Sequence, residues 1–404
     1  MKLAKVIPII VLATLVVSIA ALTFNNYAYA QANYSWIAKV EKVYWFRVPQ
    51  ENVPYALTTG QIDVYIFGIR PEMAAKLAGS PAIKLYSAPT GIDDLILNPA
   101  PVMELAYSGK NLTKAEAAKL LGVPEIAISQ IYWDSKKKAS IVDVCIRLTS
   151  VPSGFKVVKE APSSIKINPF CFKEIRFAMN YIVNRQYIVS TVFKGYAIPM
   201  YAPYSAADPT YQVIADIVAQ FMFTYNPDYA NKIITKVLTE VGAKKVGGKW
   251  YFGGSPITIP FIIRVEDERK IIGEMVAAEL EKMGFTVNRL ELQFGPAITK
   301  VYATDPMSFE WMIYTEGWGK GSIDRWDPWV VTQFAAPWFG WMPGWQEPSW
   351  WNYRNATLDK LTQAICLGKV SSKAQWIEYL RKATFISLQE AIRIWIVKIG
   401  RAHV

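Results

Sequence analysis

Short apolar segments alternate with amphipathic ones along this chain, and this alternation constrains the fold more than any other feature. Residues 42–47, 62–66 and 94–97 are rich in Val, Ile, Leu and aromatic side chains, which is typical of strands. Residues 53–59 and 71–77, which lie between them, have the apolar spacing of helices. Such alternation predicts an α/β fold, and a parallel sheet is its natural arrangement.

The second half of the chain continues the pattern with clear helix boundaries. Asn168 and Pro169 open a long helix that runs to Gly195, because Asn caps free amides and Pro suits the first turn. Gly242 and Gly284 each end a further helix. The predictions are helices at 228–241, 268–283, 356–366 and 372–390, strands at 285–292, 309–314 and 392–397, and alternating strand and turn over 245–264.

The amino-terminal segment has the layout of a secretory signal. Lys2 and Lys5 precede an apolar run over residues 6–22, and Ala28-Tyr29-Ala30 forms a cleavage site before Gln31. The run is also nearly long enough to span a bilayer, so an uncleaved amino-terminal anchor is the alternative. Both interpretations of residues 1–30 place the rest of the chain outside the cytoplasm.

The charge balance is basic without forming a nucleic-acid site. The chain carries 44 Lys and Arg against 33 Asp and Glu, a formal net charge of +11. These basic residues are scattered, and the densest group is only Lys136-Lys137-Lys138. We therefore interpret them as solvated surface charge and predict no nucleic-acid partner.

Cysteine and histidine are too few for a metal centre. Cys145, Cys171 and Cys366 are an odd number, so they cannot all form disulfides, and Cys145 with Cys171 is one candidate pair. The chain has a single histidine, His403. We predict no metal site, no His-based catalytic triad and no cofactor.

The last six residues, 399–404, differ in character from the apolar strand before them. Their sequence, IGRAHV, is the translation of a commonly used sequencing adapter. We therefore expect the natural protein to continue past Lys398, and we assign His403 no role.

Several segments, in the right order, together resemble one family. The chain is similar to the family 5 extracytoplasmic solute-binding proteins, which serve ABC importers of oligopeptides and, in heat-loving archaea, of oligosaccharides. The resemblance spans about residues 56–397 and suggests an archaeal source. The motifs that carry it are ALTTGQIDV (56–64), LILN (95–98), FKEIRFAMNYIVNR (172–185), GYAIP (195–199), the helix-to-strand step over 271–288, and a strand followed by Gly317-Trp318.

This resemblance implies an α/β fold of the periplasmic-binding-protein type, class II, with two lobes joined by crossover strands. Family members have further chain before the first motif and chain that returns to the first lobe at the end, so we expect a fold that is incomplete at the C-terminus. The implied domains are a partial first lobe at 31–109, an insertion or connector at 110–167, and a lobe bearing cleft-wall residues at 168–398.

A glycine-rich segment after the predicted strand at 309–314 is where we place the ligand. Residues 314–327 combine hydrogen-bond donors, carboxylates and indoles, and tryptophans continue beyond them. About half of the tryptophans are expected in the core, and Asn98 and Tyr201 have an equally plausible packing role. The predicted ligand-binding residues are Tyr314, Glu316, Trp318, Asp324, Arg325, Trp326, Trp338, Trp341, Asn98 and Tyr201.

The resemblance leaves the ligand class open. Peptide-binding members place an Asp three residues beyond the matching Trp, where this chain has Gly321, and Asp324 is the nearest substitute. This departure weakens the peptide interpretation and favours an oligosaccharide, without deciding between them. An exported hydrolase is the alternative function, since Glu310, Glu316, Asp324 and Asp327 supply the paired acids that glycosidases use.

We therefore predict a non-enzymatic, extracytoplasmic component of an ABC importer, secreted or held at the cell surface. It would capture an oligopeptide or an oligosaccharide between hinged lobes and deliver it to the permease subunits in the membrane.

Overall fold

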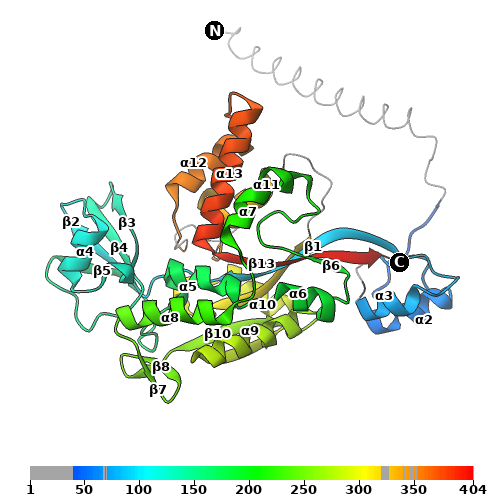
Figure 1. Cartoon of the computed structure of the whole chain (residues 1–404), viewed down its shortest axis with the longest axis horizontal. Coiled ribbons are helices and arrows are strands. Elements are labelled where there is room, and N and C mark those ends of the chain that lie inside the picture. The colour runs from blue at the N-terminus through cyan, green and yellow to red at the C-terminus, as the bar shows by residue number, and fades with distance from the viewer. Residues whose placement is uncertain are drawn as a thin grey trace, which may run out of the picture. The chain divides into compact units, whose positions relative to one another are not determined.

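The computed structural model describes residues 40–66, 69, 71–319, 327–339, 342–344, 347, 350 and 353–403 (Figure 1). Residues 1–52 and residues 53–404 form two separate units. Within the first, the described residues contain one 3-10 turn, η2 (Gln50–Asn52). The elements that follow belong to the second unit.

A six-stranded mixed sheet is the centre of the second unit. Its strand order is β11-β10-β12-β1-β13-β6. Strand β10 runs parallel to β11 and β12, whereas β1 runs antiparallel to β12 and β13. The strands are β1 (Tyr86–Leu97), β6 (Ala197–Pro199), β10 (Thr258–Arg264), β11 (Thr286–Leu292), β12 (Ile313–Gly319) and β13 (Arg393–His403).

Two smaller sheets are fully antiparallel. The four-stranded one has the order β3-β4-β2-β5, and the three-stranded one has the order β7-β8-β9. The alternating strand and turn predicted over 245–264 is confirmed: β7 and β8 are joined at Gly247-Gly248, and both glycines have the positive φ of a tight hairpin turn. The strands are β2 (Met103–Ser108), β3 (Ile128–Asp134), β4 (Ala139–Val144), β5 (Phe155–Glu160), β7 (Lys244–Val246), β8 (Lys249–Phe252) and β9 (Ser255–Pro256).

Helices pack against the six-stranded sheet and against one another. Helix α9 contacts β10, β11 and β12, α10 contacts β10, and α13 contacts α5, α7, α11 and α12. Among the described helices, none is both long and apolar enough to cross a bilayer. The helices are α2 (Val53–Thr58), α3 (Pro71–Leu77), α4 (Lys114–Leu121), α5 (Lys173–Ala178), α6 (Arg185–Tyr187), α7 (Ala215–Phe221), α8 (Pro227–Glu240), α9 (Arg269–Met283), α10 (Phe294–Tyr302), α11 (Trp329–Ala335), α12 (Ala356–Cys366) and α13 (Lys373–Glu390).

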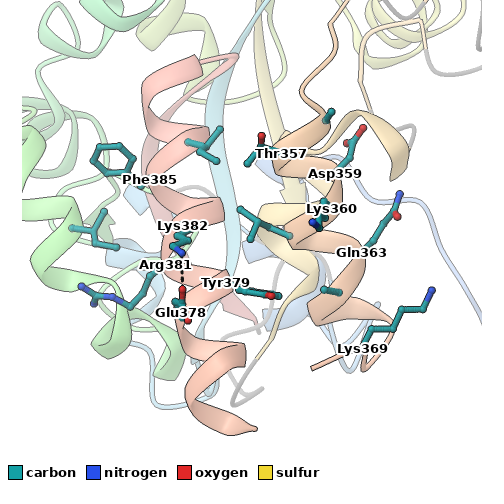
Figure 2. A pocket seen from close by; sticks show the side chains of 15 residues that line it. Thr357, Asp359, Lys360, Gln363, Lys369, Glu378, Tyr379, Arg381, Lys382 and Phe385 are labelled. Atoms are coloured by element: carbon teal, nitrogen blue, oxygen red, sulfur yellow. Dashed lines mark hydrogen bonds and ion pairs between the residues drawn. The ribbon is translucent and has the colours of Figure 1, made fainter. Parts of the chain in front are cut away.

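The boundaries of the helices predicted at 228–241, 268–283, 356–366 and 372–390 are confirmed, because residues at their ends define them. The side chains of Asn226, Asn355 and Ser372 accept hydrogen bonds from the first turns of α8, α12 and α13. Gly284 ends α9 in the left-handed conformation. Helices α12 and α13 lie side by side, and a groove runs between them (Figure 2).

Other predictions are wrong where distant parts of the chain decide the structure. Residues 42–47 and 62–66 form no strands, and Trp45 is 77% exposed. The predicted strand at 309–314 begins only at Ile313, and the predicted parallel sheet is parallel only across β11-β10-β12. A strand requires a neighbour to receive its hydrogen bonds, and local sequence does not supply that neighbour.

The predicted long helix after Asn168 is broken into short pieces. Asn184 caps a new helix by accepting from the Tyr187 amide. Buried Arg185 donates to the carbonyl oxygens of Met200, Trp395 and Asn180, which holds this region against β13. The pieces are η4 (Pro169–Cys171), α5, η5 (Met179–Tyr181), α6 and the π-helix η6 (Ile188–Val192).

A disulfide ties the four-stranded sheet to these helices. Cys145 follows β4, and it is bonded to Cys171 at the end of η4, with 5.4 Å between the Cα atoms. The candidate pair from the sequence is therefore confirmed, and Cys366 is a free thiol.

Removing this cross-link should lower stability. The bond closes a loop with a sequence separation of 26 residues, so replacing both cysteines (Cys145→Ala with Cys171→Ala) should lower the free energy of unfolding by about 3 to 4 kcal/mol. Urea denaturation would measure this change in the free energy of unfolding, with Cys366→Ala as the matched control. Equal stability of the double variant and the parent would contradict the cross-linking role.

A buried acid lies inside the four-stranded sheet. Asp143 on β4 is 2% exposed and is paired across the ladders with Glu104 on β2 and Gln130 on β3. The Gln130 amide donates to one carboxylate oxygen of Asp143, and the other oxygen has no hydrogen-bond partner. Burial, with a smaller contribution from Glu104, raises the pKa of Asp143 to about 7.

This acid should make stability depend on pH. The folded chain holds the Asp143 proton up to pH 7, whereas the unfolded chain loses it near 3.8. The free energy of unfolding should therefore fall as pH rises from 4 to 7, by up to about 4 kcal/mol. Asp143→Asn should flatten this slope, whereas Asp228→Asn at an exposed site should not. Denaturation at several pH values measures both, and an unchanged slope in Asp143→Asn would refute the assignment.

Candidate functional site

The carboxyl ends of three parallel strands meet at one edge of the large sheet. β10, β11 and β12 run in the same direction, so the residues that follow them share this edge. Open α/β sheets bind ligands at such an edge. Glu266 and Asp267 follow β10, and Phe294 follows β11. Residues 320–326, which follow β12, lie outside the described residues.

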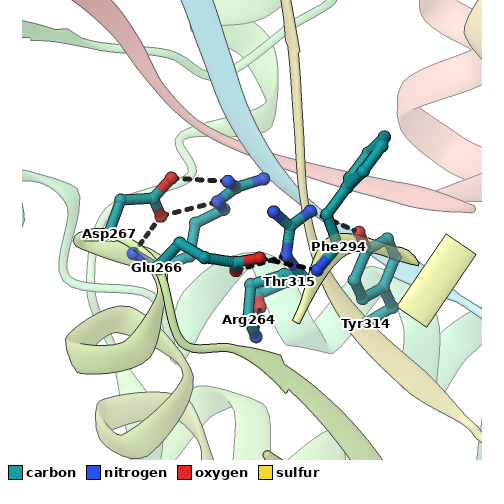
Figure 3. A network of polar contacts seen from close by, with 7 residues as sticks. Arg264, Glu266, Asp267, Phe294, Tyr314 and Thr315 are labelled. Carbon is teal, nitrogen blue, oxygen red and sulfur yellow. Dashed lines mark hydrogen bonds and ion pairs between the residues drawn. The ribbon is translucent and has the colours of Figure 1, made fainter. Parts of the chain in front are cut away.

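Arg264, at the end of β10, organises the polar contacts at this edge (Figure 3). Its Nε donates to Glu266 at 2.8 Å, and an NH group donates to the Tyr314 hydroxyl at 3.2 Å. Its guanidinium lies 4.9 Å from the centre of the Phe294 ring, which is 58% exposed. Phe294 is thereby held as an aromatic platform with a cation on one side.

A second arginine reinforces the same loop. Arg269 binds the Asp267 carboxylate with two donors, at 2.7 and 2.5 Å. Burial by itself would raise the pKa of Asp267, but the hydrogen bonds and charge of Arg269 outweigh it, and the pKa is lowered. Asp267 therefore remains a carboxylate, and the β10–α9 turn is fixed by a charge-assisted pair.

A buried ion cluster lies under the middle of β12. Arg393 on β13 donates to Asp94 on β1 at 2.9 Å and pairs with Glu316 on β12. Asp94 and Glu316 are direct partners in the β1–β12 ladder, and the Tyr302 hydroxyl of α10 donates to Glu316. All four side chains are buried. Burial raises the pKa of Asp94 in spite of the nearby Arg393 charge.

Aromatic rings continue from this cluster toward the end of β12. Trp318 is half-buried. The centre of its ring system lies 5.3 Å from the centre of the Phe334 ring and 6.4 Å from that of Tyr302. Trp329 at the start of α11 is 42% exposed, and its ring meets Phe339 edge-on at 5.7 Å. The edge therefore combines fixed charges with rings that are partly open to solvent.

The structure brings together three of the predicted ligand-binding residues. Tyr314, Glu316 and Trp318 alternate along β12, so they point to the same face of the sheet, which α10 covers. Tyr314 and Glu316 are fully buried and Trp318 is not. Asp324, Arg325, Trp326 and Trp341 lie outside the described residues.

The other three lie away from this group and have packing contacts. The buried Asn98 amide donates to the carbonyl oxygens of Pro306 and Trp311 and accepts from the Ala100 amide. The Trp338 indole donates to Thr362 at 2.7 Å. Tyr201 lies under the Arg185 guanidinium, with 5.0 Å to the ring centre.

The acids considered for hydrolysis are engaged with neighbours. Glu310 pairs with Lys300, and Asp327 accepts from the Trp329 amide at the start of α11. Glu316 belongs to the buried ion cluster. In the described part of the chain, no group of three or more His, Cys, Asp and Glu side chains is arranged to hold a metal ion.

Sequence reasoning missed Arg264, Phe294, Asp94 and Arg393. A signal was present for both arginines, because each is flanked by β-branched residues: Ile263 and Val265 beside Arg264, and Ile392 and Ile394 beside Arg393. A charged residue in such a run requires a buried partner. The sequence does not identify that partner, since Asp94 and Arg393 are separated by most of the chain.

The family model described as bacterial extracellular solute-binding proteins, family 5 middle, matches residues 25–337. No curated protein sequence matches the chain. Solved structures do match. The oligopeptide-binding protein AppA from Bacillus subtilis, in complex with a nonapeptide, is 13% identical with a TM-score of 0.53; the match covers 88% of this chain and 54% of AppA.

Two further structures give the same result. A periplasmic oligopeptide-binding protein from Thermotoga maritima with bound mannohexaose is 15% identical, with a TM-score of 0.57 and coverage of 89% of this chain and 54% of that one. NikZ from Campylobacter jejuni with Ni(L-His) is 14% identical, with a TM-score of 0.54 and coverage of 88% and 54%. The predicted α/β, periplasmic-binding-protein-like fold is confirmed, and the chain spans about half the length of these proteins.

The ion cluster should be sensitive to loss of Arg393, which pairs with both of its acids. Arg393→Met would leave Asp94 and Glu316 buried without Arg393, and the free energy of unfolding should fall by about 3 to 5 kcal/mol. Adding Glu316→Gln to that variant should restore part of the loss. Chemical denaturation measures both.

The control is Arg381→Met, which removes a partly exposed pair with Asp216 and should cost about 1 kcal/mol or less. If Arg393→Met were no more costly than this control, the cluster would not be holding the strands together.

Proposed function

This chain belongs to the family 5 extracellular solute-binding proteins, and we propose that it captures a small solute outside the cytoplasm and passes it to the permease of an ABC importer. The observation that carries the proposal is the family match over residues 25–337. The signal-like segment at residues 1–30 supports export, whether it is cleaved or kept as an anchor.

The solute would bind at the carboxyl edge of β10, β11 and β12. Trp318 follows the buried Tyr314 and Glu316 on the same face of β12. The ion pair between Glu316 and Arg393 holds that strand in place. Phe294, backed by Arg264, offers a second ring at the same edge. A rigid wall with partly open rings suits a ligand that is held by stacking and a few polar contacts. Asp324, Arg325, Trp326 and Trp341 remain proposed contributors.

The solute class is an oligopeptide or an oligosaccharide. Solved relatives of similar fold hold a nonapeptide or mannohexaose. Gly321 stands where peptide-binding members place an Asp, which favours the sugar. Open aromatic faces favour it too, because rings stack on the apolar faces of sugar units.

Capture would proceed by closure of two lobes about a hinge. Binding shifts the population toward the closed form because only that form contacts the solute from both sides. The permease would then recognise the closed form.

Calorimetry on the full chain tests the proposal, with mannohexaose and a nonapeptide library as probes. One class should bind, and Trp318→Ala should weaken that binding about tenfold or more, which is ~1.4 kcal/mol. Trp133→Ala, at an exposed indole on β3, should leave the affinity unchanged.

Three results would count against capture. They are binding of neither probe, equal affinity of Trp318→Ala and the parent, and hydrolysis of the mannohexaose, which would instead support the alternative function of an exported hydrolase.

A further inference from the structure

A groove lies between α12 and α13, away from the strands of the large sheet's carboxyl edge. It has a volume of 1230 Å³, and its lining side chains come mostly from these two helices (Figure 2). Apolar lining is supplied by Leu361 and Ala364 from α12, Phe385 and Ile386 from α13, and Ile217 from α7. Leu358 and Ile365 on α12 and Leu380 and Ala383 on α13 are buried in the protein, so the groove lies on the other side of both helices. Leu361 lies at the boundary and is 9% exposed.

The charged residues of the groove do not balance one another. Arg381 pairs with Asp216, and Lys382 pairs with Glu378. Lys360 and Lys369 are exposed and form no ion pair within the part of the chain that the structure describes. The single remaining acid is Asp359, which accepts a hydrogen bond from the Trp338 amide. The groove therefore presents an excess of positive charge beside an apolar floor.

The shape of the groove fits a third helix. Its walls are two neighbouring helices, and α12 contributes the small side chains of Ala356, Thr357 and Ala364, which permit close approach. On both helices the lining residues recur every three or four positions. The apolar residues of an amphipathic helix recur at the same spacing, so such a helix could lie along the groove with its apolar side chains against the lining. Helix-in-groove recognition uses this arrangement.

We propose that the α12–α13 groove is a docking site for an amphipathic helix of a partner protein, with acidic residues beside its apolar stripe. Leu361, Ala364, Phe385 and Ile386 receive the stripe, and Lys360 and Lys369 pair with the carboxylates. The proposal does not depend on solute capture, because the groove is formed by residues away from the carboxyl edge.

The probe is a designed amphipathic peptide of roughly three to four turns, with Leu on one stripe and Glu on both flanks. A second peptide carries Lys in place of Glu, and a third is scrambled. Fluorescence anisotropy with the full chain should give a micromolar Kd for the Glu peptide only. Ala364→Arg, which fills the groove, should weaken binding at least tenfold.

Charge exchange supplies a second variant that does not disturb packing. The double variant Lys360→Glu with Lys369→Glu should bind the Glu peptide about tenfold more weakly than the parent and should bind the Lys peptide more tightly. Lys232→Glu with Lys236→Glu on α8 makes the same change of net charge elsewhere and should have no effect. Circular dichroism confirms that each variant keeps its helices.

Other occupants would overturn the proposal. They would be revealed by binding of phosphatidylglycerol vesicles without peptide binding, or by a dimer of the chain that Ala364→Arg abolishes. Failure of the Glu peptide to bind at millimolar concentration, or equal binding to the Ala364→Arg variant, would also overturn it.

Discussion

The buried Arg393 guanidinium is the constraint on which the large sheet depends. A cation without water requires negative partners at hydrogen-bonding distance, and here they come from two other strands, Asp94 on β1 and Glu316 on β12. A shift of β1 by one residue would turn Asp94 to the other face of the sheet and leave the charges unpaired. The ion cluster therefore fixes the register of three strands that are far apart in sequence, and with it the position of Trp318.

Two buried asparagines make the connections around this sheet. Asn98 joins the end of β1 to Pro306 and Trp311, and the side chain of Asn168 donates to the carbonyl oxygens of Asn98 and Ala100. The chain leaves the large sheet near Asn98 and returns near Asn168, with the four-stranded sheet between them. Because both amides satisfy backbone groups where the chain turns away, the inserted sheet can be large without disturbing the strand before it.

The features that the sequence predicts well are those set by interactions between residues close together in the chain. Caps such as Asn226 and Ser372 and the turn at Gly284 set helix ends within one or two residues, since each acts on its own neighbours. The sequence also named Tyr314, Glu316 and Trp318 as candidate residues of one segment, but it ended the strand at residue 314, so their alternation on one face of β12 came from the structure. The partners of Arg393, the break in the helix at Asn184 and the absence of a strand at 42–47 depend on contacts with distant residues. One sequence alone does not show which distant residues come into contact, so these features could be found only in the structure.

The two proposed binding surfaces differ in how their charges are held. Among the described residues of the carboxyl edge, Arg264 and Arg269 are each paired with an acid of the same chain, so their charges are held in a fixed geometry. Such a wall suits a small solute that is recognised by shape and stacking. In the α12–α13 groove, Lys360 and Lys369 keep long, solvated side chains that cost little to redirect. Unpaired surface charge of that kind speeds encounter with a large, oppositely charged partner. A small solute and a protein partner are therefore expected at different faces, and occupation of one need not block the other.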